Sequence, residues 1–315
     1  MSESAASVAI EVNDIRKSFG DVEAVRGVSF SVPRGTVLGL LGPNGAGKTT
    51  VVRMLTTILL PDSGTATVAG FDVVKQPQSV RSNIGLAGQY AAVDENLTGH
   101  ENLTLIGRLN RLYPPQAKLR ATELLAQFGL TDAGNRTAKT YSGGMRRRLD
   151  LAAALVTHPP VLLLDEPTTG LDPASRQDLW EVIANLVSDG TTVLLTTQYL
   201  EEADRLADYL VVIDKGLVVA EGTVNELKSR LGETTIELNL GSPAAVAQAI
   251  VAMAGTVSSP SSIDPNVLQV PLGHGAQTVR SVLNQLHDAS IAVDHIDLRE
   301  PTLDDVFLSL TGGQS

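Results

Sequence analysis

The sequence predicts an α/β domain built on a mixed sheet, followed by a small α+β domain. From residue 8 to about residue 230, strand-like runs alternate with helical patterns, the order typical of helices packed on a largely parallel sheet. The aliphatic runs at residues 161–164 and 191–197 have no polar alternation, which is typical of strands covered on both faces. The pattern changes near residue 230, so we expect domains at residues 1–230 and 231–315.

The composition restricts the class of protein. The chain has 315 residues, 43% of them hydrophobic and 19% charged, which fits a globular fold. It contains no cysteine, which excludes disulfides, thiolate metal sites and a catalytic thiol. The net charge of -11 argues against a general nucleic-acid binder. No apolar run approaches the roughly 20 residues of a membrane span, and residues 1–12 lack a signal-peptide pattern. We therefore expect a cytosolic or peripheral protein.

The first domain divides into recognisable pieces. Residues 8–19 and 23–32 alternate apolar and polar side chains around a short turn, which predicts an antiparallel β pair. Residues 36–42 predict a buried strand, and residues 48–60 predict a helix that ends before Pro61. Residues from about 90 to 157 are mainly helical in pattern, so we expect an inserted helical subdomain.

The second domain has the pattern of a ferredoxin-like unit. We expect strands at residues 234–240, near 256–259, at 266–272 and at 291–298, and helices at 243–255 and 276–289. This β-α-β-β-α-β order is the ferredoxin-like one. Thr302 and Asp305 have the spacing of a capping box for a last helix, which would carry Val306, Phe307 and Leu310 on one face.

A glycine-rich segment predicts a phosphate-binding loop. It matches G-x-x-x-x-G-K-[ST] between an expected strand and an expected helix, with the residues Gly42, Pro43, Asn44, Gly45, Ala46, Gly47, Lys48 and Thr49, followed by Thr50. The glycines let backbone N–H groups converge on an anion at the positive end of a helix. In such a loop Lys48 reaches the β- and γ-phosphates and the Thr49 hydroxyl ligates Mg²⁺. The alternative is a tight glycine-rich turn without a ligand.

Two adjacent acids, Asp165 and Glu166, follow the aliphatic run at residues 161–164. In a phosphate-loop fold, the aspartate at such a strand end holds Mg²⁺ beside the loop hydroxyl, which assigns this role to Asp165. Glu166 could then orient or deprotonate the attacking water. Taken alone, two acids after an apolar run would more simply begin a solvated loop, but the phosphate-binding loop favours a nucleotide site.

The segment "YSGGM" at residues 141–145 points to a family. Ser142, Gly143 and Gly144 open a helical pattern, so their N–H groups form a second anion site. Together with the phosphate-binding loop and the two acids, in this order, the segment resembles the signature of ATP-binding cassette (ABC) ATPases over residues 8 to about 230. Tyr141 and Met145 stand where the family usually has Leu and Gln.

The resemblance implies further site residues. Phe19 matches the aromatic residue that stacks on adenine, although it could instead only pack the hairpin. Gln89 matches the glutamine that touches Mg²⁺ or the lytic water, with a surface glutamine as the alternative. Asp172 matches the loop that crosses to the partner's phosphate-binding loop. Gln198 stands where the family usually has His, at the end of a core strand, and would be a neutral γ-phosphate sensor.

Three consecutive arginines follow the signature. They could form a basic patch for nucleic acid, but a solvated helix face is the simpler interpretation of Arg146, Arg147 and Arg148.

The family resemblance implies partners. Residues 42–49 of one chain would face residues 142–144 of another in a head-to-tail dimer, with ATP and Mg²⁺ between them. The second chain would be another copy or a paralogous cassette. Integral-membrane permease subunits would bind the segment at residues 89–105 and hold the chain at the cytoplasmic face of the membrane. No nucleic-acid partner is expected.

Two short segments narrow the resemblance. "TTQYLEEAD" at residues 196–204 and "LDDVF" at residues 303–307 are similar to the daunorubicin/doxorubicin resistance ATPase family of drug exporters. This implies an ATP-hydrolysing exporter subunit for a hydrophobic drug, antibiotic or lipid, with a C-terminal dimerisation or regulatory domain. A soluble ABC ATPase acting on ribosomes or DNA, and an importer ATPase, are the alternatives.

Overall fold

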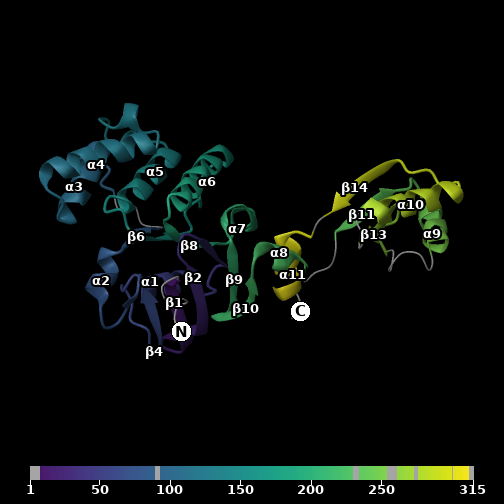
Figure 1. Ribbon diagram of the computed structural model, residues 1–315, viewed down its shortest axis with the longest axis horizontal. Coiled ribbons are helices and arrows are strands. Elements are labelled where there is room, and N and C mark those ends of the chain that lie inside the picture. Colours follow the sequence, from purple (N-terminus) through teal and green to yellow (C-terminus); the bar gives the residue numbers. More distant parts are fainter. Residues whose placement is uncertain are drawn as a thin grey trace. The chain divides into compact units, whose positions relative to one another are not determined.

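The chain forms two compact units. The computed structural model describes residues 8–88, 93–229, 234–253, 261–272, 276–299 and 301–311. The units are Met1–Val224 and Asn225–Ser315, and both are drawn in Figure 1. The division at Val224 lies ahead of the boundary expected near residue 230.

The first unit is built on a six-stranded mixed sheet. Its order is β10-β9-β3-β8-β7-β6, with β3 (Val37–Leu41), β6 (Ile84–Ala87), β7 (Val161–Asp165), β8 (Thr192–Thr197), β9 (Tyr209–Asp214) and β10 (Leu217–Gly222). All neighbours are parallel except the edge strand β10, which pairs antiparallel with β9. Every residue of β3, β7 and β8 is buried, as strands covered on both faces require. The predicted α/β class with parallel core strands is confirmed.

A second, antiparallel sheet shares a hydrophobic core with one helix and the six-stranded sheet. Its order is β2-β1-β4-β5, with β1 (Val8–Phe19), β2 (Val22–Pro33), β4 (Ser63–Val68) and β5 (Phe71–Asp72). The predicted pair is confirmed, since β1 and β2 are antiparallel neighbours joined by a tight turn. One hydrophobic cluster joins this sheet, helix α1 (Lys48–Leu55) and one face of the six-stranded sheet.

Helix α1 ends earlier than the sequence predicted. It stops at Leu55, and not just before Pro61. Thr57 adopts a left-handed conformation with φ of 63°. The N–H of Ile58 then donates to the Arg53 carbonyl, and that of Thr57 to the Met54 carbonyl. These two bonds are a Schellman motif, which satisfies the last carbonyls and turns the chain away.

Helices cover the other face of the six-stranded sheet. The segment predicted to be helical contains α3 (Gly99–Leu109), α4 (Pro114–Gln127) and α5 (Gly143–Ala154). The remaining helices of this unit are α2 (Pro77–Ser82), α6 (Pro173–Ser188) and α7 (Leu200–Leu206), and α8 (Val224–Ser229) spans the division between the units. In Figure 1 helices α3 to α6 gather on the side of the sheet opposite β1 and β4, and a second hydrophobic cluster joins them to it.

The second unit has the strand order of a ferredoxin-like fold. Its antiparallel sheet runs β12-β13-β11-β14, with β11 (Thr235–Asn239), β12 (Ser261–Asp264), β13 (Val267–Pro271) and β14 (His295–Arg299). Helices α9 (Pro243–Ala252) and α10 (Ala276–Asp288) complete the β-α-β-β-α-β series. The strand predicted at 256–259 lies outside the described residues, and β12 follows it. Strand β14 begins four residues later than the 291 expected, because the pairing with β11 starts at His295.

The last helix begins at the predicted cap. Helix α11 (Leu303–Thr311) follows Thr302, whose N–H donates to Asp305 Oδ2 at 3.0 Å, while the Asp305 N–H donates to Thr302 Oγ1 at 3.2 Å. This reciprocal pair is the capping box. Val306 is buried and Phe307 is half-buried, whereas Leu310 lies outside the residues whose side chains are described.

The tyrosine that departs from the family signature has a structural partner. The buried Tyr141 hydroxyl donates to the Ala133 carbonyl at 2.8 Å. A Cβ on Gly99 would overlap this hydroxyl, so the larger side chain fits because a glycine faces it.

We expect Tyr141→Phe to lower the free energy of unfolding by about 1 kcal/mol, because it removes a buried hydrogen bond to the Ala133 carbonyl, which keeps the Arg136 N–H as its other donor. Chemical denaturation measures this difference. Tyr113→Phe is the matched control, since its side chain is 73% exposed, and its effect should stay within about 0.5 kcal/mol. Equal effects of the two variants would contradict the assignment.

Candidate active site

The phosphate-binding loop joins β3 to α1, and two of its glycines are required by their surroundings. Gly47 has φ of 108°, and a Cβ there would lie 2.5 Å from the Ala24 carbonyl oxygen. A Cβ on Gly42 would overlap the carbonyl oxygen of Ile213. The loop therefore runs against β2 and β9 too closely for any side chain at these two positions.

Lys48 is a buried cation beneath this loop. It is 3% exposed, and its Nζ donates to the carbonyl oxygens of Gly42 at 2.8 Å and Pro43 at 3.1 Å. The same ammonium lies 3.6 Å from Glu166 Oε1. Burial lowers the pKa of Lys48, whereas the carboxylates of Glu166 and Asp165 act in the opposite direction. The loop thus holds a positive charge at the start of a helix, where an anion is favoured.

Oxygen ligands converge beside Lys48. The Thr49 hydroxyl donates to Asp165 Oδ1 at 3.2 Å, and the Thr196 hydroxyl donates to the same oxygen at 2.5 Å. Within the described ranges, no group of three or more His, Cys, Asp or Glu could hold a metal by itself. Mg²⁺ commonly takes one or two carboxylates together with substrate phosphates and water. Thr49 and Asp165 therefore fit a Mg²⁺ that arrives with a nucleotide, while Gln89 lies outside the described residues.

Glu166 has a left-handed backbone with φ of 51°. This conformation is unfavourable for a residue with a Cβ and persists where neighbours hold it. The Glu166 N–H donates to both the carbonyl and the hydroxyl of Thr196, at 3.1 Å each. Its carboxylate accepts a hydrogen bond from Thr169 Oγ1 at 3.3 Å and is 9% exposed. The turn therefore directs the acid toward Lys48 and away from bulk water.

Gln198 leaves β8 at the same edge of the sheet. In the parallel pairing of β7 and β8, Asp165 lies opposite Thr196. The Gly42 N–H donates to the Thr197 carbonyl at 3.4 Å, so the phosphate-binding loop starts beside the residue before Gln198. Gln198 is half-buried there. The structure thus places the residue next to the strand that ends in the two acids, as the sequence predicted.

The signature residues begin helix α5. The Ser142 hydroxyl caps the helix by accepting from the Met145 N–H at 3.2 Å. Nothing lies within 4 Å of where a Cβ on Gly143 would be, whereas a Cβ on Gly144 would meet Ser175 Oγ at 2.5 Å. In the described part of the chain, no hydrogen bond joins residues 142–144 to residues 42–49. The structure therefore does not bring the signature and the phosphate-binding loop of one chain together.

Asp172 and Phe19 lie on other elements than the two acids, at the start of α6 and at the end of β1. Asp172 caps α6, since its two carboxylate oxygens accept from the Ser175 N–H at 3.0 Å and the Ser175 hydroxyl at 2.7 Å. These bonds hold the pKa of Asp172 below its usual range. Phe19 is 49% exposed, and the Lys17 ammonium lies 5.9 Å from the centroid of its ring. The exposed ring is free to stack on a planar group.

The expectation of a solvated arginine face on α5 is wrong for Arg147, whereas the Arg146 side chain is 34% exposed. Arg146 forms an ion pair of 2.6 Å with Glu95, and Arg148 Nη1 donates to the Phe128 carbonyl at 3.4 Å. Arg147 turns inward and donates to backbone carbonyls that follow β6 and β7. The reason is that α5 lies against the ends of these strands, where carbonyls need donors.

Sequence reasoning also missed Thr196, which supports both acids. The sequence could have indicated this role, because the hydroxyl of a threonine at the polar end of an aliphatic strand can hydrogen-bond to the end of a neighbouring strand. The inward turn of Arg147 had no such signal within its run of three arginines.

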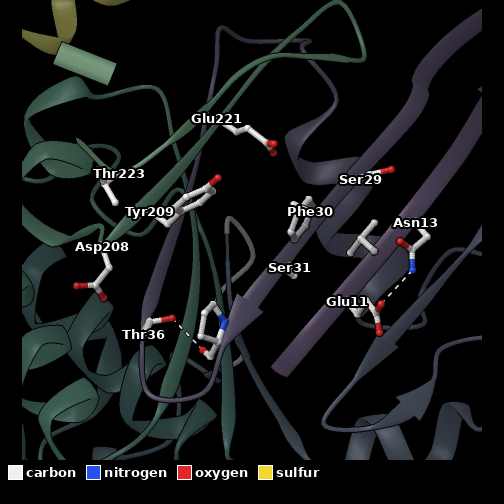
Figure 2. A pocket seen from close by; sticks show the side chains of 12 residues that line it. Glu11, Asn13, Ser29, Phe30, Ser31, Thr36, Asp208, Tyr209, Glu221 and Thr223 are labelled. Atoms are coloured by element: carbon white, nitrogen blue, oxygen red, sulfur yellow. Dashed lines mark hydrogen bonds between the residues drawn. The ribbon is translucent and has the colours of Figure 1, made fainter. Parts of the chain in front are cut away.

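A hollow of about 700 Å³ lies elsewhere on the first unit, between β1 and β2 on one side and the β9–β10 region on the other (Figure 2). Phe30 and Tyr209 line it together with the acids Glu11, Asp208 and Glu221. The Asp208 carboxylate has a structural role, since its Oδ2 accepts a hydrogen bond from the Val37 N–H at 2.8 Å. The hollow shares no residue with the phosphate-binding loop or with the two acids, so it is a separate feature.

Comparison with known proteins agrees with this geometry. The family model described as ABC transporter matches residues 25–169. A second model, described as ATP-binding protein DrrA1-3-like, C-terminal domain, matches residues 222–311. Among solved structures, one titled "Structure of ATP binding subunit of ABC transporter" has a TM-score of 0.64 and 28% identity, and the match covers 71% of this chain and 93% of that one. A nucleotide-free ATP-binding cassette has a TM-score of 0.62 at 28% identity, covering 69% and 91%.

Curated relatives match nearly the whole chain. The daunorubicin resistance ATP-binding protein DrrA3 of Streptomyces coeruleorubidus is 50% identical, covering 98% of this chain and 97% of the relative. The daunorubicin/doxorubicin resistance ATP-binding protein DrrA of Streptomyces peucetius is 50% identical, covering 96% and 92%. The doxorubicin resistance ATP-binding protein DrrA of Mycobacterium tuberculosis is 47% identical, covering 96% and 94%. The chain therefore belongs to the ABC transporter ATP-binding proteins with a DrrA-like C-terminal domain, whose members hydrolyse ATP to drive transport.

Proposed function

We propose that this ATPase drives the export of a hydrophobic drug, antibiotic or lipid through a separate permease. The observation that carries the proposal is the arrangement of Lys48, Thr49, Asp165 and Glu166 at one edge of the sheet. The names of the similar proteins support the substrate class, because they describe resistance to daunorubicin and doxorubicin. The similarity extends through the C-terminal domain, which is outside the nucleotide site.

The nucleotide would lie along the phosphate-binding loop. Backbone N–H groups such as those of Gly45, Gly47 and Thr49, together with the Lys48 ammonium, would bind the phosphates, and the exposed Phe19 ring would stack on the adenine. Thr49 and Asp165, and by the family resemblance Gln89, would hold Mg²⁺. The ion would supply charge neutralisation on the transferred phosphoryl group.

Glu166 is the proposed catalytic base. Its carboxylate lies near Lys48 and would accept the proton of the attacking water as the water reaches the γ-phosphate. Lys48 would stabilise the negative charge that develops on the phosphate oxygens. Gln198, at the end of the neighbouring strand, would donate a neutral hydrogen bond from its amide to the γ-phosphate.

A second cassette would complete each site. One chain has one phosphate-binding loop and one signature, and the open surface around Gly143 and the exposed Ser142 leave the start of α5 accessible. In the proposed head-to-tail dimer, Ser142, Gly143 and Gly144 would bind the γ-phosphate on the partner chain, and Asp172 would approach the partner's phosphate-binding loop. The partner would be a second copy or a paralogous cassette, and the C-terminal domain would assist assembly or regulation.

The proposed permease contact would extend from the segment at residues 89–105 to the end of α3. Leu105 is 46% exposed, Leu109 is 73% exposed and Tyr113 is 73% exposed, so apolar side chains follow one another along α3 and its end. Such a row is typical of a surface that another protein covers. Among the described helices, none combines the length and apolarity of a membrane span. We propose that the chain reaches the cytoplasmic face of the membrane through this contact.

We expect Glu166→Gln to lower ATP turnover by at least about 10³-fold, because the amide cannot accept the proton of water. ATP binding should remain, so that the variant collects as an ATP-bound dimer in size-exclusion chromatography. Glu181→Gln, a change of an exposed glutamate on α6, is the control with normal turnover. Wild-type turnover in Glu166→Gln would remove this residue from catalysis.

We expect Gln198→Ala to slow hydrolysis about 10-fold or more through loss of one hydrogen bond to the transferring phosphate. Gln198→His should give a pH–rate profile with a titration near pH 6.5 that the wild type lacks, because imidazole gains a charge in that range. Steady-state rates from pH 5.5 to 8.5 test both variants. Unchanged hydrolysis in Gln198→Ala would contradict the sensor role.

We expect Leu109→Asp to reduce co-purification of the integral-membrane subunit by about 10-fold, because a charge would replace the exposed apolar contact. ATP hydrolysis by the isolated chain should not change. Ile58→Asp, at a residue 66% exposed on a different part of the unit, is the control. Recovery with ribosomes and no membrane protein would instead support a soluble ABC ATPase.

A further inference from the structure

The Arg147 side chain reaches from helix α5 to the ends of two sheet strands. Its Nε donates to the Pro167 carbonyl at 2.6 Å, and its Nη2 donates to the Glu166 carbonyl at 3.2 Å. Nη1 donates to the Gly88 carbonyl, next to the end of β6, and lies 3.4 Å from Asp150 Oδ2. The side chain is 15% exposed. All three nitrogens of the guanidinium therefore have protein partners.

This set of contacts requires an arginine. The guanidinium is a rigid planar fork with five N–H donors, so it can serve several carbonyls in different directions at once. A lysine ammonium is a single point and could not reach all three carbonyls. Burial lowers the pKa of Arg147 and the Asp150 carboxylate opposes this, but a guanidinium stays protonated in either case.

The Glu166 carbonyl is the contact that bears on the reaction. Glu166 has the left-handed backbone described above, and a left-handed residue with a Cβ needs neighbours to hold it. Thr196 accepts from its N–H, and its C=O accepts from Arg147 Nη2 at 3.2 Å and from the Thr169 N–H at 3.3 Å. These bonds fix the backbone on both sides of the Glu166 Cα, and Arg147 is the one partner among them that comes from helix α5.

We infer that Arg147 is a positioning residue for the catalytic carboxylate. The inference rests on the proposed role of Glu166. Arg147 follows the start of α5 at Gly143 by about one turn, and Ser142 caps this helix, so a displacement of the helix would be transmitted through the guanidinium to Glu166. The orientation of the acid then depends on the position of the signature helix.

We expect Arg147→Gln to lower kcat on the order of 10²-fold, because a shift of a reacting group by about 1 Å has an effect of this size. The dissociation constant for ATP should change by less than about threefold, since no phosphate contact is removed. Steady-state hydrolysis and equilibrium binding of ATP measure the two quantities. Arg147→Lys should show most of the loss in kcat, because one ammonium cannot replace the fork.

Arg148→Gln is the matched control, since it removes the neighbouring arginine of the same helix, whose guanidinium donates to the Phe128 carbonyl at 3.4 Å. Its kcat should stay within about twofold of the wild type. A normal kcat in Arg147→Gln would overturn the inference, and so would equal losses in kcat for both arginine variants. A loss of ATP binding or of thermal stability in parallel with kcat would also overturn it, because it would indicate damage to the fold.

The outcome for Glu166→Gln separates the two proposals. If Glu166→Gln has no turnover while Arg147→Gln is normal, the positioning inference fails and the proposed function stands. If Glu166→Gln hydrolyses ATP normally, the proposed role of Glu166 fails whatever Arg147→Gln does.

Discussion

The arrangement of the first unit depends on the burial of one cation and two carboxylates at a single edge of the sheet. Lys48, Asp165 and Glu166 are each less than one-tenth exposed. Removing such charges from water is unfavourable unless they are paired and hydrogen-bonded. The fold meets this requirement with two loop carbonyls for Lys48 and two hydroxyls for Asp165. The position of the phosphate-binding loop beside Lys48, and of the Thr49 and Thr196 hydroxyls beside Asp165, meets this need for hydrogen-bond partners.

Parallel strands make this concentration of charge possible. The carboxyl ends of parallel strands meet at one edge of a sheet, and ligands bind there in open α/β folds. Strands β3, β7 and β8 are neighbours, and they are followed by the phosphate-binding loop, the two acids and Gln198 respectively. The same strands are wholly buried along their length, so polar groups are confined to their ends. The separation of apolar strand and polar end is visible in the sequence, and it is why these strands and the loop were predictable.

The parts that were not predictable depend on partners distant in the sequence. The run of three arginines on α5 has the pattern of a solvated face, and only the position of α5 against β6 and β7 shows that Arg147 turns inward. The end of α1 depends on the left-handed conformation of Thr57, a residue type that rarely adopts it. Tyr141 fits its place because Gly99, 42 residues earlier, leaves room for the hydroxyl. In each case the local pattern is compatible with two structures, and a tertiary contact selects one.

Within one chain, helix α5 connects the signature to the proposed catalytic acid through Arg147. The start of α5, at Ser142 and Gly143, faces outward, while Arg147 on the same helix holds the Glu166 carbonyl inward. A rigid helix transmits a displacement along its length, because its backbone hydrogen bonds keep the turns together. A group that binds at the outward end would therefore act on the acid in its own chain. In the proposed head-to-tail dimer that acid would serve the other nucleotide, so the inferred role of Arg147 would connect each site mechanically to its neighbour.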